Sequence, residues 1–483
     1  GGGEVYIGGG WQGKDSSIRN ADKVVMQDGA RIDVSATQQG NGGTAVLWSE
    51  SFTNFRGQIS AKGGENGGNG GQVETSSHGN LQAFGSVSAS AKKGKAGNWL
   101  LDPIDMEIVG SAGSNAADET EDDSGKIFSP GSATHSQVSN TSINSELNSG
   151  TSVTILTNSA VAGSSSQLGN ITVNAAINKT GGADATLTLK ADGNINVNNN
   201  ITSTHGKLNV NLSAANTSNG TITLGNSVNI TTNGGDITAG TANASNSVTI
   251  NVTGTTLNTS NGSQAGNINL NGSRVNVTNA NITAGNFTLN ATANGSNLNN
   301  VTLMATHDII LTGSNTTGVG LQLNGTNTLN ATGGAISFNG TSGKSRGIDI
   351  GGTSNMTATA INLTGSSTDA EGIDISGSST LTATSGNISL NGTTSSAWYG
   401  VRIQGSNITA TNGSINLTGN STNGTGLQLN GINTLNATNG SINLTGNSTN
   451  GTGIDLQGTN TLTATGGAIS FNGTSGKSRG INI

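Results

Sequence analysis

Short runs of alternating aliphatic and polar residues recur at a nearly constant interval along the chain. The interval is clearest near the C-terminal end, where a glycine is followed by an aliphatic, a polar and a second aliphatic residue. The glycines of these runs are Gly347, Gly372, Gly400, Gly426, Gly453 and Gly480. They lie 25, 28, 26, 27 and 27 residues apart. A fixed period of this length is typical of repeat architectures.

Two further alternating runs lie between successive glycines. Three short strands separated by Gly, Asn and Ser turns are expected to form one rung of a parallel β-helix, in which each rung stacks on the next. The period of two places Leu381, Ala383, Ile388 and Leu390 inside. A β-sandwich would need hairpins instead of a constant return. We therefore predict an all-β chain, a parallel β-helix (β-solenoid) of about 17 rungs with three short strands each, the rungs being 25–28 residues long.

The repeat divides the chain into three segments. Residues 1–110 and 151–483 follow the period, the second segment as repeats rich in Asn, Ser, Thr and Gly. Between them, in residues 111–150, the period lapses. An acidic run from Asp118 to Asp123 predicts a loop that leaves the solenoid, and the residues after it suggest a short helical turn.

Composition supports a strand-rich chain over a disordered one. Only 9% of the residues are charged, and only two are proline, whereas disordered chains are usually rich in both.

The chain has no cysteine, which fits an exported protein. It begins at Gly1 and ends within a repeat, so we expect it to be a fragment. Residues 151–483 carry nine basic and nine acidic side chains, and this neutral stretch offers no basic stripe for nucleic acid.

Three strings in the N-terminal part resemble a known family. They recur at the period of the repeat, with Val46, Val73 and Trp99 lying 27 and 26 residues apart. The strings are Gly43-Thr-Ala-Val-Leu-Trp-Ser49, Gly70-Gly-Gln-Val-Glu-Thr-Ser76 and Gly97-Asn-Trp-Leu-Leu-Asp-Pro103. In this order and spacing, they resemble the region after the secretion domain of two-partner-secretion exoproteins, the group of filamentous haemagglutinin and the high-molecular-weight adhesins. The resemblance covers about residues 1–160.

The resemblance implies a right-handed β-helix that is secreted through an outer-membrane transporter and displayed on the bacterial cell surface. The transporter would recognise a secretion domain that is absent from this sequence. The resemblance also implies attachment to a receptor or glycan on host cells.

The triplet Asn-x-Ser/Thr, an N-glycosylation sequon, occurs about forty times, always at or after Asn140. We expect one strand column to present an outward sequon asparagine in every rung, and a second column to present two more. The first column comprises Asn339, Asn362, Asn391, Asn416, Asn443 and Asn472, and the second contains Asn330 and Asn436. The alternative is that these asparagines only serve the corners of the solenoid, where Asn is favoured.

The resemblance implies that a cytoplasmic N-glycosyltransferase adds short hexose units to such sequons. Rungs are expected to stack about 4.8 Å apart, close to the width of one sugar ring. We therefore expect short glycans with partial or alternating occupancy.

No catalytic or metal-binding pattern stands out, and we expect no cofactor and no enzymatic activity. The four histidines have no metal-ligand spacing. Asp349 and Asp374 fall in adjacent rungs as outward residues of one column, and some parallel β-helices that act on polysaccharides use carboxylates. Outward Thr-x-Thr pairs, such as Thr382 and Thr384, suggest an ice-binding ladder as a further alternative.

The most variable corner precedes each glycine of the repeated run and carries the candidate partner-binding residues. These are Lys344, Arg346, Trp398, Tyr399, Lys477 and Arg479. The two aromatic residues either stack on a sugar ring or fold down to cover a rung. Together these features predict a rigid, N-glycosylated segment of a secreted adhesin that attaches to host cells. The alternative is a passive spacer or stalk.

Overall fold

A computed structural model describes residues 1–110, 119–122, 125–128, 135–158 and 168–483. It is nearly all β-structure, and its stacked parallel strands form a β-solenoid of about 16 turns, which confirms the predicted parallel β-helix. The chain forms two compact units. Unit 1 contains residues 1–248 and 258–263, and unit 2 contains residues 249–257 and 264–483. The acidic run Asp118–Asp123, predicted to form a loop, lies partly outside the described residues.

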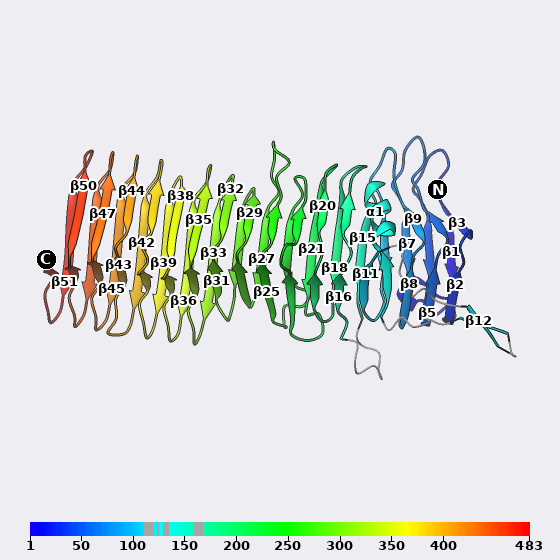
Figure 1. The fold of residues 1–483 in the computed structure, drawn as a ribbon, viewed down its shortest axis with the longest axis horizontal. Coiled ribbons are helices and arrows are strands. Elements are labelled where there is room, and N and C mark those ends of the chain that lie inside the picture. The colour runs from blue at the N-terminus through cyan, green and yellow to red at the C-terminus, as the bar shows by residue number, and fades with distance from the viewer. Residues whose placement is uncertain (111–118, 123–124, 129–134, 159–167) are drawn as a thin grey trace. The chain divides into compact units, whose positions relative to one another are not determined.

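In each unit, successive rungs stack their strands in parallel sheets along three sides (Figure 1). The first sheet of unit 1 contains β1 (Glu4–Ile7), β4 (Thr44–Leu47), β7 (Gln72–Thr75), β10 (Asn98–Leu101), β15 (Ser152–Leu156), β18 (Ala185–Lys190), β21 (Leu208–Ala214) and β24 (Ile237–Thr241). The second contains β2 (Ala21–Met26), β5 (Ser49–Phe55), β8 (Asn80–Ala83), β14 (Gln137–Ser139), β11 (Met106–Val109), β16 (Ile171–Val173), β19 (Ile195–Val197) and β22 (Gly220–Leu224). The third side carries β3 (Arg31–Asp33), β6 (Gln58–Ser60) and β9 (Ser86–Ser88), and later β17 (Ile177–Lys179), β20 (Ile201–Ser203) and β23 (Asn229–Thr231).

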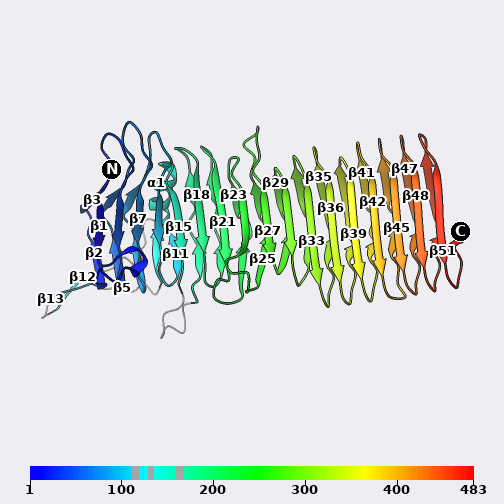
Figure 2. The same ribbon diagram turned by 180° about the vertical axis from the view of Figure 1, so that it is seen from behind.

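Unit 2 repeats this arrangement (Figure 2). Its first sheet contains β27 (Ile268–Gly272), β30 (Phe287–Ala291), β33 (Ile309–Asn315), β36 (Ile336–Ser342), β39 (Ile361–Ser367), β42 (Ile388–Thr394), β45 (Ile415–Ser421), β48 (Ile442–Ser448) and β51 (Ile469–Ser475). Its second contains β28 (Arg274–Thr278), β31 (Ser296–Asn299), β34 (Leu321–Asn324), β37 (Ile348–Ile350), β40 (Ile373–Ile375), β43 (Val401–Gln404), β46 (Leu427–Asn430), β49 (Ile454–Leu456) and β52 (Ile481–Asn482).

The third sheet of unit 2 contains β29 (Asn281–Ala284), β32 (Thr302–Ala305), β35 (Thr326–Ala331), β38 (Thr353–Ala358), β41 (Thr380–Ala383), β44 (Asn407–Ala410), β47 (Ile432–Ala437) and β50 (Thr459–Ala464). Strands β25 (Val248–Thr253) and β26 (Thr256–Asn258) lie where the chain divides. Unit 1 also contains the 3₁₀ turn Trp11–Gly13 and the antiparallel strands β12 (Glu119–Asp122) and β13 (Gly125–Phe128).

Inward-facing aliphatic residues stack along each unit and form its core. Leu381, Ala383, Ile388 and Leu390, predicted to lie inside, are all buried. Their side chains face inward because successive residues of a strand point to opposite faces. Stacking therefore buries a continuous column that a single rung could not bury.

The three strings that carry the family resemblance form the adjacent strands β4, β7 and β10. Their register differs by one residue from the predicted alignment, because Ala45, not Val46, aligns with Val73 and Trp99. Val46 instead aligns with Glu74. Both Val46 and Leu47 are buried, so the aliphatic pattern of this string does not by itself define its register.

One helix, α1 (Asn140–Asn148), takes the place of a strand in unit 1. It contacts β9 on one side and β17 on the other. The side chain of Ser139 caps its N-terminus by accepting a hydrogen bond from the Thr141 N–H. The side-chain oxygen of Asn144 accepts a hydrogen bond from the Asn178 N–H at 2.8 Å. The helix therefore supplies an acceptor that a neighbouring strand would otherwise provide.

Two buried carboxyl groups make the stability of unit 1 depend on pH. Burial raises the pKa of Glu146, on α1, to about 8 and that of Glu74, on β7, to about 7. Both values lie above the ordinary value of 4.5, so the folded state holds these protons more tightly than the unfolded state. The contribution to stability is therefore largest at low pH and is lost as the pH rises through about 7 and 8.

We predict that the free energy of unfolding of unit 1 falls by on the order of 6 kcal/mol between pH 5 and pH 9. Urea unfolding of the full chain, followed by Trp fluorescence in a Trp398→Phe background, measures it. Glu146→Gln should flatten the pH dependence, while the exposed control Asp22→Asn should leave it unchanged. A stability that rises with pH would contradict the prediction.

Candidate functional site

The six sequon asparagines predicted to form a single column lie in two columns on the outward surface of the first sheet in unit 2. Asn339, Asn391 and Asn472 align with Thr364, Thr418 and Thr445. Asn362, Asn416 and Asn443 lie two residues earlier in the register and align with Ser337, Ser389 and Ser470. The isoleucine that begins each of these strands sets this register, and it is buried in all of them except β51, where Ile469 is exposed. Asn follows that isoleucine by one residue in some rungs and by three in others, so both columns face outward.

This split changes the spacing of the candidate glycosylation sites. Within a column, Asn416 and Asn443 are direct neighbours, and the Asn443 amide nitrogen donates to the Asn416 side-chain oxygen at 2.8 Å. Asn362 and Asn416 are separated by the rung of Ser389. A rung rises by about 4.8 Å, so most asparagines of a column have at least twice this spacing.

The third sheet carries the Thr-x-Thr pairs together with Asn330 and Asn436. The first threonines of the pairs align in register as predicted, for example Thr357 with Thr382. Asn330, Asn436 and the exposed Met304 occupy other positions of the same column. The second threonines lie just beyond the ends of their strands. The described surface is therefore a mixed column of Thr, Asn and Met.

The corners between the first and second sheets are joined by a column of hydroxyl side chains that sequence reasoning missed, here called the serine ladder. Its members share one register position and are Ser342, Ser367, Thr394, Ser421, Ser448 and Ser475. The Ser342 hydroxyl accepts from the Ser345 N–H at 2.8 Å and donates to the Gly318 carbonyl, in the preceding rung, at 2.7 Å. Ser448 makes the same two bonds with Gly451 and Gly424. The ladder thus fixes each corner and ties it to the previous one.

One corner departs from this pattern. The corner from Thr394 to Gly400 is one residue longer than the corner from Ser367 to Gly372. Thr394 bonds to the Ser396 hydroxyl at 2.9 Å, and Ser396 in turn accepts from the Trp398 N–H at 3.2 Å. Ser396 therefore links Thr394 to the backbone of Trp398 across the extra residue. Trp398 and Tyr399 lie in this longer corner.

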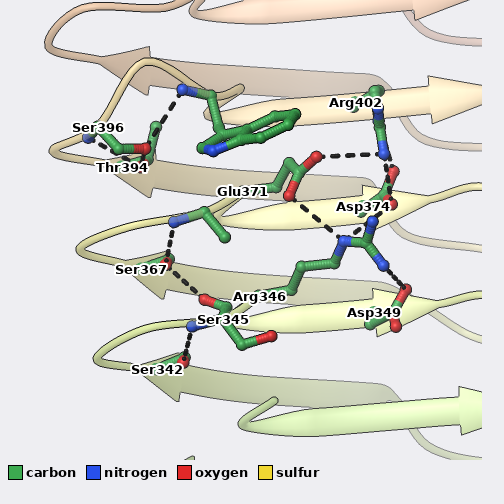
Figure 3. Close-up of polar contacts among 12 residues, drawn as sticks. Ser342, Ser345, Arg346, Asp349, Ser367, Glu371, Asp374, Thr394, Ser396 and Arg402 are labelled. Carbon is green, nitrogen blue, oxygen red and sulfur yellow. Dashed lines mark hydrogen bonds and ion pairs between the residues drawn. The ribbon is translucent and has the colours of Figure 1, made fainter. Parts of the chain in front are cut away.

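Next to this corner, five charged side chains from three rungs form an ion cluster (Figure 3). Arg402 donates two hydrogen bonds to Asp374, both at 2.8 Å, and contacts Glu371 at 3.1 Å. Arg346 lies 3.3 Å from Asp349, 3.3 Å from Glu371 and 3.2 Å from Asp374. The two guanidinium groups thus bridge all three carboxylates.

The positions of Asp349 and Asp374 correct the sequence prediction. They align in adjacent rungs, as expected, but they are buried (4% and 0% exposed) and are not surface carboxylates. Their strand positions face outward, yet Arg346, Glu371 and Arg402 cover them. Burial raises the pKa of Asp349, and the nearby Arg346 opposes this shift. Hydrogen bonds to Asp374 raise the pKa of Arg402.

The predicted partner-binding residues separate into two groups. Arg346 belongs to the ion cluster. Tyr399 packs against the cluster, with its ring centre 5.2 Å from the Arg402 guanidinium carbon. Trp398 remains 48% exposed, so of the aromatic pair Tyr399 covers the cluster and Trp398 faces solvent. Lys344 is also exposed. Lys477 and Arg479 are exposed in the last rung, apart from the cluster.

The sequence contains a signal for both the serine ladder and the ion cluster. A Ser or Thr stands five or six residues before every glycine of the repeated run, and that spacing marks the serine ladder. The opposite charges of Asp374 and Arg402 occupy the same position of successive repeats, which places them side by side.

Within the part of the chain that the structure describes, no three or more His, Asp or Glu side chains lie close enough to hold a metal ion. No helix among the described residues has the length and apolar character needed to cross a membrane. The sequence matches no protein-family model and no curated protein.

Removing one member of the ion cluster should destabilise unit 2. Arg402→Ala leaves Asp374 and Glu371 buried with less compensating charge, which costs on the order of 3 kcal/mol. Amide hydrogen exchange of the full chain should show faster exchange in β40 and β43. Lys344→Ala, which removes an exposed cation, is the matched control and should change stability by less than about 0.5 kcal/mol. Unchanged protection of β40 in Arg402→Ala would show that the cluster adds no stability.

Proposed function

We propose that this chain is a segment of a secreted bacterial adhesin that is displayed on the cell surface, carries N-linked sugars and attaches to host cells. The observation that carries the proposal is the placement of the sequons. The eight asparagines singled out by the sequence all lie at partly or fully exposed positions. A strand buries every second side chain, so consistent outward placement leaves all eight accessible to a sugar.

The N-terminal strings support the secretion part of the proposal. They form three neighbouring strands of one sheet, as expected for repeats of one solenoid, and they carry the resemblance to two-partner-secretion exoproteins. In this proposal, a cytoplasmic N-glycosyltransferase first adds sugars to the chain. An outer-membrane transporter then recognises a secretion domain outside this sequence and exports the chain.

The surface of unit 2 supports two roles in different rungs. Residues 412–426 and 439–453 are identical in sequence, and they stack asparagine on asparagine, as in Asn416 with Asn443 and Asn420 with Asn447. Such a uniform surface favours the alternative role of a spacer. The corners from Lys344 to Arg402 vary from rung to rung and expose Trp398, which favours contact with a partner. The chain then acts through its surface, without catalysing a reaction.

One further sequon asparagine differs from these eight because it is buried. Asn315 lies in the sequon Asn-Thr-Thr but is buried. Its side-chain oxygen accepts from the Thr317 and Gly318 N–H groups, and its amide nitrogen donates to the Val319 carbonyl. A sugar on this nitrogen would have no room inside the corner.

We predict hexose on Asn339, Asn362 and Asn391 and none on Asn315 when the chain is made with its native transferase. Peptide mass spectrometry of the folded protein measures occupancy at each site. Substantial occupancy at Asn315 would contradict the structural argument. Absence of hexose at every site would overturn the glycosylation part of the proposal.

Attachment is tested by adding the purified chain, made with and without the transferase, to epithelial cells. We expect the chain to bind saturably, and Trp398→Ala to reduce binding severalfold without changing thermal stability. Ile432→Ala, which truncates another exposed apolar side chain of unit 2, is the control. Failure of both forms to bind would reject the adhesin and leave the spacer.

A further inference from the structure

A polar hollow lies in unit 2 where the corners between the first and second sheets change length. Only Ser273 separates β27 from β28, whereas residues 292–295 separate β30 from β31, and residues 316–320 separate β33 from β34. The longer corners project beyond the short one and leave a hollow of about 290 Å³ beside it.

The lining of the hollow is polar and carries one positive charge. Arg274, on β28, is exposed, and its guanidinium makes no ion pair or hydrogen bond with any described residue. In the next rung, Val275 aligns with Ser296, and the residue before Ser296 is Gly295, which has no side chain to fill the space beside Arg274. At Gly295, φ is +73°, and an added Cβ would lie 2.3 Å from the Val319 carbonyl oxygen. The corner therefore requires glycine here and keeps the space beside the guanidinium open.

Three amide side chains line the floor of the hollow in one column. Asn276, Asn297 and Gln322 align in successive rungs of the second sheet. Asn276 and Gln322 each use their amide nitrogen within the column, toward Asn251 at 2.9 Å and Asp349 at 3.2 Å. Asn297 accepts from Asn324 at 3.2 Å, and its own amide nitrogen donates to no described residue. The column thus offers both acceptors and a donor, about 4.8 Å apart.

We propose that this hollow binds a saccharide that bears a carboxylate, such as a uronic acid. Arg274 pairs with the carboxylate, because a guanidinium presents a planar fork of donors that matches it. The amides bind the hydroxyl groups of the rings, since an amide can both donate and accept. No carboxylate lines the hollow to compete for Arg274. The inference rests on the proposed function only for the source of the sugar, which is the host-cell surface.

The test compares tetragalacturonate with its methyl-esterified form, which differs in the charge of the carboxyl groups. The full chain is made without the transferase, because Asn276 and Asn294, which line the hollow, lie in sequons and their sugars would fill it. By calorimetric titration we expect the acid to bind at least about tenfold more tightly than the ester, as for one charge-assisted pair. Equal affinity for the two forms, or no binding of either, overturns the proposal.

Two variants locate the binding site. Arg274→Gln should reduce the affinity for the acid to that for the ester. Asn297→Asp changes neither size nor the acceptor for Asn324 but adds a repelling charge, and it should also weaken acid binding. Lys93→Gln removes an exposed cation in unit 1 and should have no effect. Acid binding that is unchanged in Arg274→Gln overturns the proposed site.

Cell attachment of the same proteins separates this inference from the proposed function. A chain that binds tetragalacturonate through Arg274 but does not attach to cells supports the hollow and rejects the adhesin. A chain that attaches to cells but does not bind tetragalacturonate rejects the hollow and supports the adhesin.

Discussion

The in-register stacking of one rung on the next is the constraint on which the rest of this structure depends. Main-chain hydrogen bonds set the rise, and the buried aliphatic columns set which residues face outward. A shift of one residue would turn Ile388 and Leu390 to the solvent and Ser389 to the core. Once the register is set, any residue type that recurs at the period becomes a column. The sequon asparagines, the serine ladder and the polar column of the second sheet all arise in this way.

Because the rungs are similar in sequence, a rung can pair with the wrong neighbour during folding. Residues 412–426 and 439–453 contain nothing that distinguishes one rung from the other. The ion cluster, in contrast, distinguishes the rungs that contribute to it. Arg346, Asp374 and Arg402 come from three different rungs, and a slip of one rung would bring Asp349 and Asp374 to positions that their arginines no longer reach. A buried polar group that is satisfied in a single arrangement can specify that arrangement even where it adds little stability.

The architecture could be predicted from the sequence because it follows from a period and an alternation. The period and the alternation were sufficient to predict that Leu381 and Ile388 face inward. The placement of Asp349 and Asp374 could not be predicted from alternation, since a residue that faces outward from its strand can still be covered by a neighbouring corner. Arg346 and Tyr399 cover them from corners whose conformation depends on the serine ladder. The division of the six predicted asparagines between two columns follows from their distance to the aligned isoleucines: Asn362 stands one residue after Ile361, whereas Asn391 stands three residues after Ile388.

The order of strands in the second sheet of unit 1 has a consequence for how the chain reaches its fold. Strand β14 follows β11 in the sequence but lies between β8 and β11. Gln82 and Gln137 are paired across this join, which closes a long loop. A chain that folds as it emerges, N-terminal end first, cannot complete the pairing of β11 until β14 has arrived. Growth of the solenoid therefore pauses at this rung, and the entropy of closing the loop contributes to the barrier there.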